Sequence, residues 1–465
     1  MSGTVWTRAL ALTLATTLAC GGDDAAPIDA PAATCAVAPM VAGTPATDGL
    51  ADAAASCGAT PFAWRREASL GSLTERTART DYAAATLAAL AQAGGVILPS
   101  PPVHAVGVID VGYETQDRGA RVTSSTSIAY PTDLAAGETV PVLLLLHGTS
   151  GFRRGCGPTA DSTFKLLAAV LASYGWIVAT PDYLGLESLG DDYPALHPYL
   201  QGQSTAIASL DAARAALRLA VEEGLCPRPE LAVVGGSQGG HAALWVDRLA
   251  PYYARELELL GTVATVPPSD LVAHSDRALR QLVDASANTL AMLTAQAPWY
   301  GRDLSQVLRP PYLTSVPSAM AASCDPGGAV EPTSLAEVFT APLLDHVATA
   351  SVATFPGFGC LFVENSLTDT TVARINPASP SYGILFVLGQ DDTLVVPDLE
   401  RAAYDELCAA GLPLSYLECA GASHTRATTW SLPEILDFLD ARRARQPFAP
   451  ACTRPAAVIC RGTPS

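Results

Sequence analysis

The sequence predicts an α/β protein whose mostly parallel sheet has helices on both faces and carries a helical cap insertion. Continuous aliphatic runs at Val142–Leu146, Leu231–Val234 and Ile384–Leu388 are typical of strands buried on both faces. The helix-spaced apolar pattern over Ser204–Glu223 is typical of a crossover helix between parallel strands. Residues 270–378 interrupt this alternation and predict a cap over the carboxyl edge of the sheet.

The remaining segments continue the alternation. An antiparallel strand pair is expected at Val103–Glu114 and Arg121–Tyr130. Further strands are expected at Trp176–Thr180, Gly261–Val266 and Leu414–Glu418, and further helices at about 160–174, Gln238–Ala250, Asp398–Ala410 and Leu432–Arg445. These elements predict one domain over residues 61–450, followed by a cysteine-containing tail over 451–465.

The first 60 residues predict an export signal and a tether. Residues 1–19 combine Arg8 with an apolar stretch that is too short to span a bilayer, as in a signal peptide. A small residue before Cys20 resembles a bacterial lipoprotein cleavage box, so we expect a lipid on Cys20, with ordinary signal cleavage as the alternative. Residues 20–60 predict a flexible tether. We therefore expect an exported bacterial lipoprotein that is anchored to the cell envelope through this lipid alone. A secreted protein without the lipid is the alternative.

The net charge and the spacing of the cysteines indicate which kinds of binding partner are not expected. A formal net charge of −18 disfavours nucleic-acid binding, because an acidic surface repels phosphate groups. The 11 cysteines show no Cys-x-x-Cys spacing, so no metal site is predicted, and no cofactor is expected. Cysteines in an exported chain predict disulfides. Cys35–Cys57 and Cys452–Cys460 are the trial pairings, because each pair is close in the chain.

A nucleophile motif lies between a predicted strand and a predicted helix. Gly235-Gly236-Ser237-Gln238-Gly239 has the form Gly-x-Ser-x-Gly. In a strand–turn–helix context this form is typical of a nucleophile elbow, where small flanking residues let the strand and helix approach closely. The motif predicts an α/β-hydrolase fold in which the nucleophile is Ser237.

In that fold the acid and the base follow the serine along the chain. Asp391 and Asp392 both lie just beyond a predicted strand, and we expect Asp392 to be the acid, with Asp391 as the alternative. His424 lies on the loop after the next strand, from which it can reach both partners, so it is the expected base. His241, one turn into the helix after the serine, is interpreted as a packing residue.

Two backbone amides are expected to stabilise an oxyanion. One is the amide of Gln238, directly after the nucleophile. The other should come from the loop after Val142–Leu146, which begins with a His-Gly pair. We expect the Thr149 amide to be this donor, with Ser150 as the alternative.

Several separated segments resemble the secretory lipase family, the lipase A type of α/β-hydrolase. They are His147–Gly151, Pro181–Leu186, His197–Leu200, Gly236–Gly240, Gly389–Pro397, and Cys408–Gly411 leading to Gly421–His424. The resemblance spans about 105–445 and implies the hydrolase fold, a cap and hydrolysis of carboxylic esters.

We therefore expect a serine-dependent lipase or carboxylesterase that acts on an ester or lipid through an acyl-enzyme. A peptidase or other acyl hydrolase is the alternative, because the fold and the triad do not set the leaving group. An inactive hydrolase-like binding protein is the third hypothesis.

Overall fold

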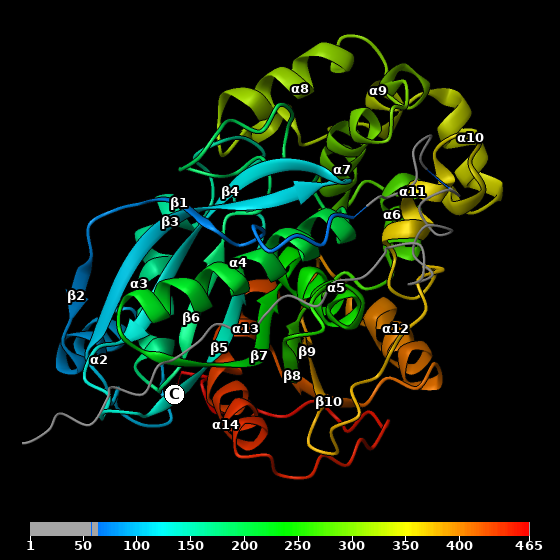
Figure 1. Cartoon of the computed structure of the whole chain (residues 1–465). Helices are drawn as coiled ribbons and strands as arrows, with labels where there is room; N and C mark the ends of the chain where they lie inside the picture. Colours follow the sequence, from blue (N-terminus) through cyan, green and yellow to red (C-terminus); the bar gives the residue numbers. More distant parts are fainter. Residues whose placement is uncertain (1–56, 58–63, 465) are drawn as a thin grey trace, which may run out of the picture. The chain divides into compact units, whose positions relative to one another are not determined.

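The computed structural model describes residue 57 and residues 64–464. Their strands form one 10-stranded sheet in the order β1-β3-β4-β6-β5-β7-β8-β9-β10, with β2 paired to β3 (Figure 1). The strands are β1 Leu73–Arg76, β2 Thr80–Tyr82, β3 Val106–Asp117, β4 Ala120–Pro131, β5 Thr139–Leu146, β6 Ile177–Pro181, β7 Cys226–Gly236, β8 Glu258–Thr265, β9 Ile384–Gly389 and β10 Leu414–Cys419. Neighbouring strands from β6 to β10 run parallel, which confirms the mostly parallel sheet.

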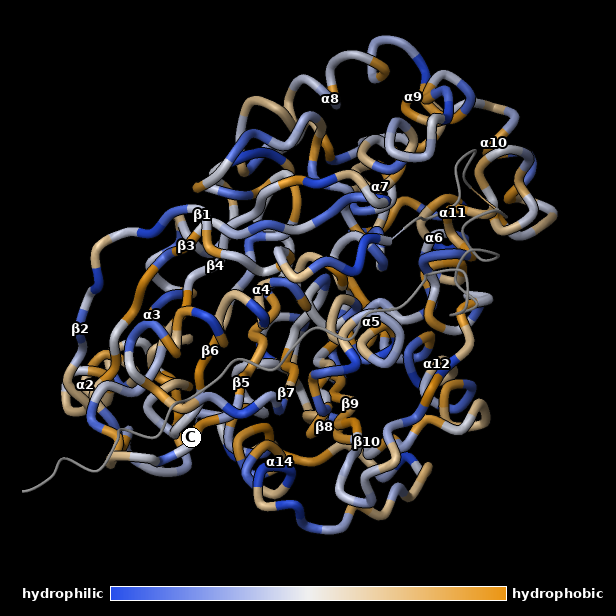
Figure 2. Tube along the Cα trace, in the orientation of Figure 1, coloured by the Kyte–Doolittle hydropathy of each residue, from blue (hydrophilic) through white to orange (hydrophobic). Residues whose placement is uncertain are grey.

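Helices cover both faces of this sheet. The flanking helices are α2 Ala84–Ala93, α3 Ser162–Ala172, α4 Gly202–Glu222, α5 Gln238–Tyr253, α12 Pro397–Ala409, α13 His424–Trp430 and α14 Leu432–Arg443. Along β5, Val142 and Leu144 join the core under α4 and α5, whereas Leu143 and Leu145 join the core under α3 and α14. Both faces of β5 are buried, which explains its unbroken aliphatic run. Central strands such as β8 and β9 are accordingly hydrophobic (Figure 2).

Between β8 and β9 the chain forms a helical insertion instead of a single crossover helix. Its helices are α6 Leu271–Arg280, α7 Ala285–Trp299, α8 Tyr312–Ala322, α9 Leu335–Val338, α10 Ala341–Thr349 and α11 Gly359–Asn365. They gather at the upper right of the sheet in Figure 1. α6 packs on α7, α10 and α11. This insertion, called the cap below, lies where the alternation of strands and helices was expected to break.

Most predicted elements are present, with ends shifted by a few residues. β1, β2, α2 and α13 were not predicted; α13 begins at His424, a position that we expected within a loop. The expected signal peptide and Cys20 lie outside the described residues, as does almost all of the tether. None of the helices in the described part of the chain is both long and apolar enough to cross a membrane.

Four disulfides join cysteines of the described segments. They are Cys57–Cys360, Cys156–Cys324, Cys408–Cys452 and Cys419–Cys460. Cys226 is disulfide-bonded as well. The trial pairings Cys35–Cys57 and Cys452–Cys460 are therefore wrong. Their premise fails because the fold joins cysteines that lie 41 to 303 residues apart in the sequence.

Cys156–Cys324 ties the cap to the segment that follows β5, so the double variant Cys156→Ser/Cys324→Ser should lose stability. We expect its free energy of unfolding to fall by about 2–4 kcal/mol, because the bond closes a long loop in the unfolded chain. Urea unfolding measures the change. The control Ala322→Ser alters an exposed neighbouring position and should stay within about 0.5 kcal/mol of the parent. Equal stability of both variants would contradict a structural role for this bond.

Candidate active site

Ser237 occupies the tight turn between β7 and α5. Its backbone has φ 57° and ψ −122°, a conformation that residues with a side chain rarely adopt. A Cβ atom on Gly235 would lie 2.0 Å from the carbonyl oxygen of Gly239, and one on Gly239 would lie 2.1 Å from that of Leu146. Glycine is required at both positions because strand, helix and the neighbouring β5 approach this closely.

The structure brings Ser237, His424 and Asp392 together. His424 Nε2 lies 2.8 Å from Ser237 Oγ, and its Nδ1 lies 2.7 Å from Asp392 Oδ2. Because the carboxylate faces Nδ1, it favours the tautomer with a hydrogen there, and Nε2 is left to accept the serine proton. Asp392 Oδ1 accepts hydrogen bonds from the amides of Leu394 (2.9 Å) and Val395 (3.0 Å), which fix the orientation of the carboxylate.

The imidazole of His424 is hydrogen-bonded to Asp392 and not to Asp391, the alternative acid. Its side chain is exposed, whereas that of Asp392 is buried. Its backbone amide donates a hydrogen bond to the carbonyl of Ala422 at 2.9 Å, on the loop that leads to His424. Of the two aspartates, Asp392 is therefore the one placed beside the imidazole, and Asp391 helps to join the two loops.

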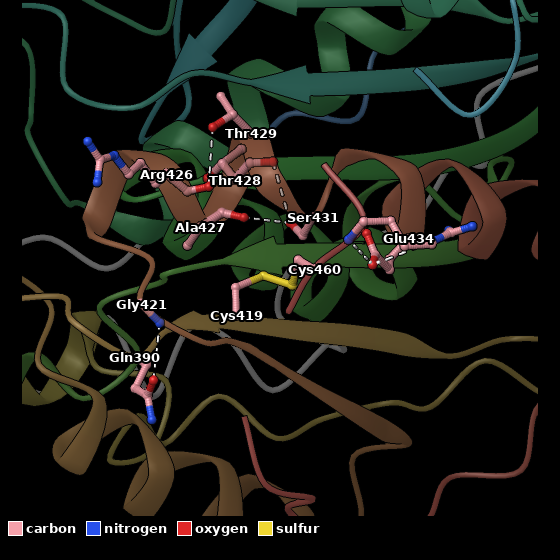
Figure 3. Close-up of a disulfide and its surroundings, with 11 residues drawn as sticks. Gln390, Cys419, Gly421, Arg426, Ala427, Thr428, Thr429, Ser431, Glu434 and Cys460 are labelled. Atoms are coloured by element: carbon pink, nitrogen blue, oxygen red, sulfur yellow. Dashed lines mark hydrogen bonds and ion pairs between the residues drawn. A yellow bond between two sulfur atoms is a disulfide. The ribbon is translucent and has the colours of Figure 1, made fainter. Parts of the chain in front are cut away.

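The loop that leads to His424 is held in place by further contacts. The side-chain oxygen of Gln390 accepts a hydrogen bond from the amide of Gly421 at 3.1 Å. The Cys419–Cys460 disulfide ties the start of the loop to the C-terminal segment (Figure 3). Since β9 and β10 are adjacent and parallel, the acid loop and the base loop leave the sheet at the same edge. These contacts fix the imidazole relative to its carboxylate partner.

The expected oxyanion donors lie on both sides of Ser237. Gln238 begins α5, and the first amides of a helix have no acceptor within that helix. The loop that carries Thr149 passes beside the elbow, since a Cβ atom on Gly148 would lie 3.6 Å from the Ser237 Cβ. The hydroxyl of Ser150, the alternative donor residue, lies 3.2 Å from the imidazole of the His-Gly pair that begins the loop. The backbone amides of Thr149 and Ser150 are thus both on this loop, and both are candidates for the second oxyanion donor.

Two further imidazoles, for which no role was expected, support this region. The rings of His147 and His197 both stack with that of Tyr183, at centroid distances of 4.1 and 5.8 Å. Burial lowers the pKa of His147 to about 4 and that of His197 to about 3. His197 is therefore neutral at pH 7. Its Nδ1 donates to the carbonyl of Leu184 at 2.8 Å, and its Nε2 accepts from the side-chain amide of Gln238 at 2.7 Å. These bonds anchor the residue after the nucleophile.

His241 lies in the interior of the protein. Its Nε2 is 2.7 Å from the carbonyl oxygen of Asn365, and its ring contacts Trp245. Burial lowers its pKa to about 4. These contacts agree with the interpretation of His241 as a packing residue.

A small pocket opens beside Ser237. Its apolar lining comes from Leu200, Pro268, Leu271, Met292, Leu394 and Val395. Its polar lining includes His274 and Ser275 of α6 and Asn288 and Thr289 of α7. The cap therefore contributes much of the surface that faces the candidate nucleophile.

Two hydrogen bonds link the cap to the loop of the candidate oxyanion donor. Asn288 Nδ2 donates to the hydroxyl of Tyr199 at 2.8 Å, and that hydroxyl lies 2.8 Å from Thr149 Oγ1. Tyr199 is buried. The position of α7 is therefore coupled to the loop beside Ser237.

Within residues 57 and 64–464, no group of three or more His, Cys, Asp or Glu side chains is arranged to hold a metal ion.

The fold is that of an α/β-hydrolase. The structure of Candida antarctica lipase A is similar, with a TM-score of 0.63, 15% identity and coverage of 85% of this chain and 87% of that chain. The rice cell wall degrading esterase LipA from Xanthomonas oryzae has a TM-score of 0.62, 19% identity and coverage of 81% and 98%. At such identities the likeness concerns the fold.

The chain belongs to the secretory lipase family, which matches residues 159–450. A protein of Mycobacterium tuberculosis, named a probable inactive lipase, is 25% identical over 350 residues, which are 70% of each chain. Lipase 2 of Candida albicans is 24% identical over 297 residues, which are 61% of this chain and 58% of that one. Membership of a secretory family, together with the disulfides, indicates an exported protein.

The close contact between Gly239 and β5 predicts that a larger residue at this position of the elbow lowers the stability of the protein. Gly239→Ala should destabilise the protein by about 1–3 kcal/mol, because its Cβ would meet the Leu146 carbonyl and force the backbone apart. Thermal and urea unfolding measure this loss. Gly328→Ala is the matched control, since a Cβ there meets nothing within 4 Å. If the two variants were equally stable, the close approach at the elbow would be refuted.

Proposed function

We propose that this protein is a serine hydrolase of carboxylic esters, with Ser237 as nucleophile, His424 as base and Asp392 as acid. The observation that carries the proposal is the continuous series of hydrogen bonds from Asp392 through His424 to Ser237, at a strained turn that opens on a pocket. Membership of a lipase family supports it.

Acylation begins when His424 Nε2 accepts the proton of Ser237 Oγ and the oxygen adds to the ester carbonyl carbon. Negative charge develops on the carbonyl oxygen, where the amides of Thr149 and Gln238 donate hydrogen bonds. Asp392 stabilises the imidazolium. When the tetrahedral intermediate collapses, the imidazolium gives its proton to the leaving alcohol, and the acyl group stays on Ser237.

Deacylation repeats these steps with water. His424 accepts a proton from the water molecule, and the oxygen adds to the acyl carbon. Collapse breaks the bond between that carbon and Ser237 Oγ. The proton returns to the serine, and the carboxylic acid leaves.

The remaining features form a consistent proposal for the whole chain. Residues 61–450 constitute the catalytic domain, and the 270–378 insertion is its cap. Residues 1–19 direct export, and a lipid on Cys20, at the end of the 20–60 tether, anchors the protein to the cell envelope. An ester or lipid is the substrate, in keeping with the lipases and the esterase to which the chain is similar.

An inactive binding protein is the competing function, because one relative is named a probable inactive lipase. The side chains that hydrolysis needs are present and hydrogen-bonded in this chain, which favours an enzyme. Release of nitrophenol from short p-nitrophenyl esters separates the two functions. A parallel assay with peptidyl amides separates an esterase from a peptidase.

Ser237 should react covalently with a fluorophosphonate probe. We expect one adduct, located on Ser237 by peptide mapping, because the neighbouring imidazole activates this hydroxyl. Ser237→Ala should lose both the adduct and the esterase activity. A wild-type protein that is folded but takes no label would overturn the proposed function.

The two neighbouring aspartates provide a matched pair of variants. Asp392→Asn should lower kcat by roughly 10³- to 10⁴-fold, because the imidazole loses the carboxylate that sets its tautomer. Asp391→Asn should change kcat by less than about threefold, since its side chain is exposed and its contact is made by the backbone. Steady-state kinetics of both variants and the wild type on one ester measure these changes in kcat. The opposite ranking would reassign the acid.

A further inference from the structure

The structure contains two carboxylate–imidazole pairs near Ser237: His424–Asp392, which the proposed reaction uses, and a second pair whose imidazole lines the pocket beside Ser237. The second consists of His274 on α6 and Glu400 on α12, with 2.8 Å between His274 Nε2 and Glu400 Oε1. His274 lines the pocket together with Ser237. Since Ser237 Oγ is hydrogen-bonded to His424 and not to His274, the second pair has no part in the proton transfers described above.

The carboxylate of this second pair is firmly oriented. Glu400 is fully buried, and its Oε1 also accepts a hydrogen bond from the amide of Ser269 at 2.9 Å. A carboxylate fixed in this way favours the His274 tautomer with a hydrogen on Nε2. The ring then offers the lone pair of Nδ1 as an acceptor.

Within the described residues, Nδ1 of His274 has no hydrogen-bond partner, although the ring is nine-tenths buried and borders the pocket. Two hydroxyl groups on α6 and α7 also line the pocket. Ser275 and Thr289 are both buried pocket-lining residues, and neither hydroxyl is hydrogen-bonded within the part of the chain that the structure describes. A plain alkyl chain in this pocket would leave these polar groups without partners, which is unfavourable.

We propose that the His274–Glu400 pair binds a hydroxyl group of the ester substrate, so that the enzyme selects hydroxylated esters over plain alkyl esters. This inference rests on the proposed function and names its substrate class. The substrate hydroxyl donates a hydrogen bond to His274 Nδ1, and its oxygen can accept a hydrogen bond from the hydroxyl of Ser275 or Thr289. His274 is thus a specificity residue of the same pocket in which Ser237 attacks.

A hydroxyl fits better than a charged group. The rest of the pocket lining is largely apolar, and a full charge buried there would lose its hydration. A carboxylate on the substrate would in addition be repelled by the buried Glu400, whose Oε2 has no hydrogen-bond partner among the described residues. A neutral donor satisfies Nδ1 without either cost.

Two pairs of esters test the proposal, because the hydroxyl group could belong either to the acyl part or to the alcohol part of the ester, called the acyl arm and the alcohol arm. For the acyl arm, p-nitrophenyl 3-hydroxybutyrate is compared with p-nitrophenyl butyrate. For the alcohol arm, 4-hydroxybutyl acetate is compared with butyl acetate by titration of the released acid. We expect the hydroxylated member of one pair to have a kcat/KM about tenfold higher, a preference of the size that one hydrogen bond provides. No preference in either arm would overturn the proposal.

The variants locate the source of the preference. His274→Phe keeps a ring and removes both nitrogens, so the ratio of kcat/KM values should fall to about one. Glu400→Gln keeps the volume but weakens the basicity of the imidazole, and should lower the ratio severalfold. His104→Phe is the matched control, because His104 forms an exposed pair with Asp133 at 2.9 Å and does not line the pocket. An unchanged ratio in folded His274→Phe would overturn the inference.

A binding measurement separates this inference from the proposed function. Ser237→Ala should bind the preferred hydroxylated ester about tenfold more tightly than its plain counterpart, as measured by calorimetry or ligand-observed NMR. The double variant Ser237→Ala/His274→Phe should bind both equally. If the wild type hydrolyses no ester and this binding preference still holds, the proposed function fails and the hydroxyl site stands. If hydrolysis occurs and the binding preference is absent, the reverse is true.

Discussion

The close approach of β5, β7 and α5 at the elbow is the constraint on which the site depends. The Gly239 Cα packs against the carbonyl end of β5, and Gly235 packs against the first turn of α5. A larger residue at either position would force these elements apart. The same approach holds Ser237 in its unusual conformation and brings the loop after β5 beside it, so that one backbone contact positions both the candidate nucleophile and a candidate oxyanion donor.

A second constraint acts across the sheet. The acid loop and the base loop follow adjacent parallel strands. Hydrogen bonds between their backbones join the two loops, independently of the side chains. Asp392 and His424 therefore meet because β9 and β10 are neighbours. The disulfide at the end of β10 adds a covalent tie between the base loop and the C-terminal segment. The position of the imidazole thus follows mainly from the order of the strands in the sheet.

These constraints explain what could be predicted from the sequence. Ser237 lies in a local sequence motif, Gly-x-Ser-x-Gly. In this fold the acid and the base follow the serine along the chain, just after later strands. The three side chains that meet were therefore predicted together. The disulfides were not, since Cys57 and Cys360 are 303 residues apart and no local pattern connects them. His274 and Glu400 were missed for the same reason, because they lie on different helices, 126 residues apart. Their pairing follows from how the cap packs against α12.

The two carboxylate–imidazole pairs near Ser237 are built alike, yet we propose catalysis for one and binding for the other. In both pairs a buried carboxylate fixes one ring nitrogen and leaves the other free to accept a hydrogen bond. The pair at His424 faces a hydroxyl on a strained turn, with helix amides beside it that can stabilise negative charge on an adding oxygen. The His274 ring lines the pocket and has no such turn or helix amides assigned to it. The same side-chain chemistry is therefore proposed to serve reaction in one place and recognition in the other, because the backbone around the two rings differs.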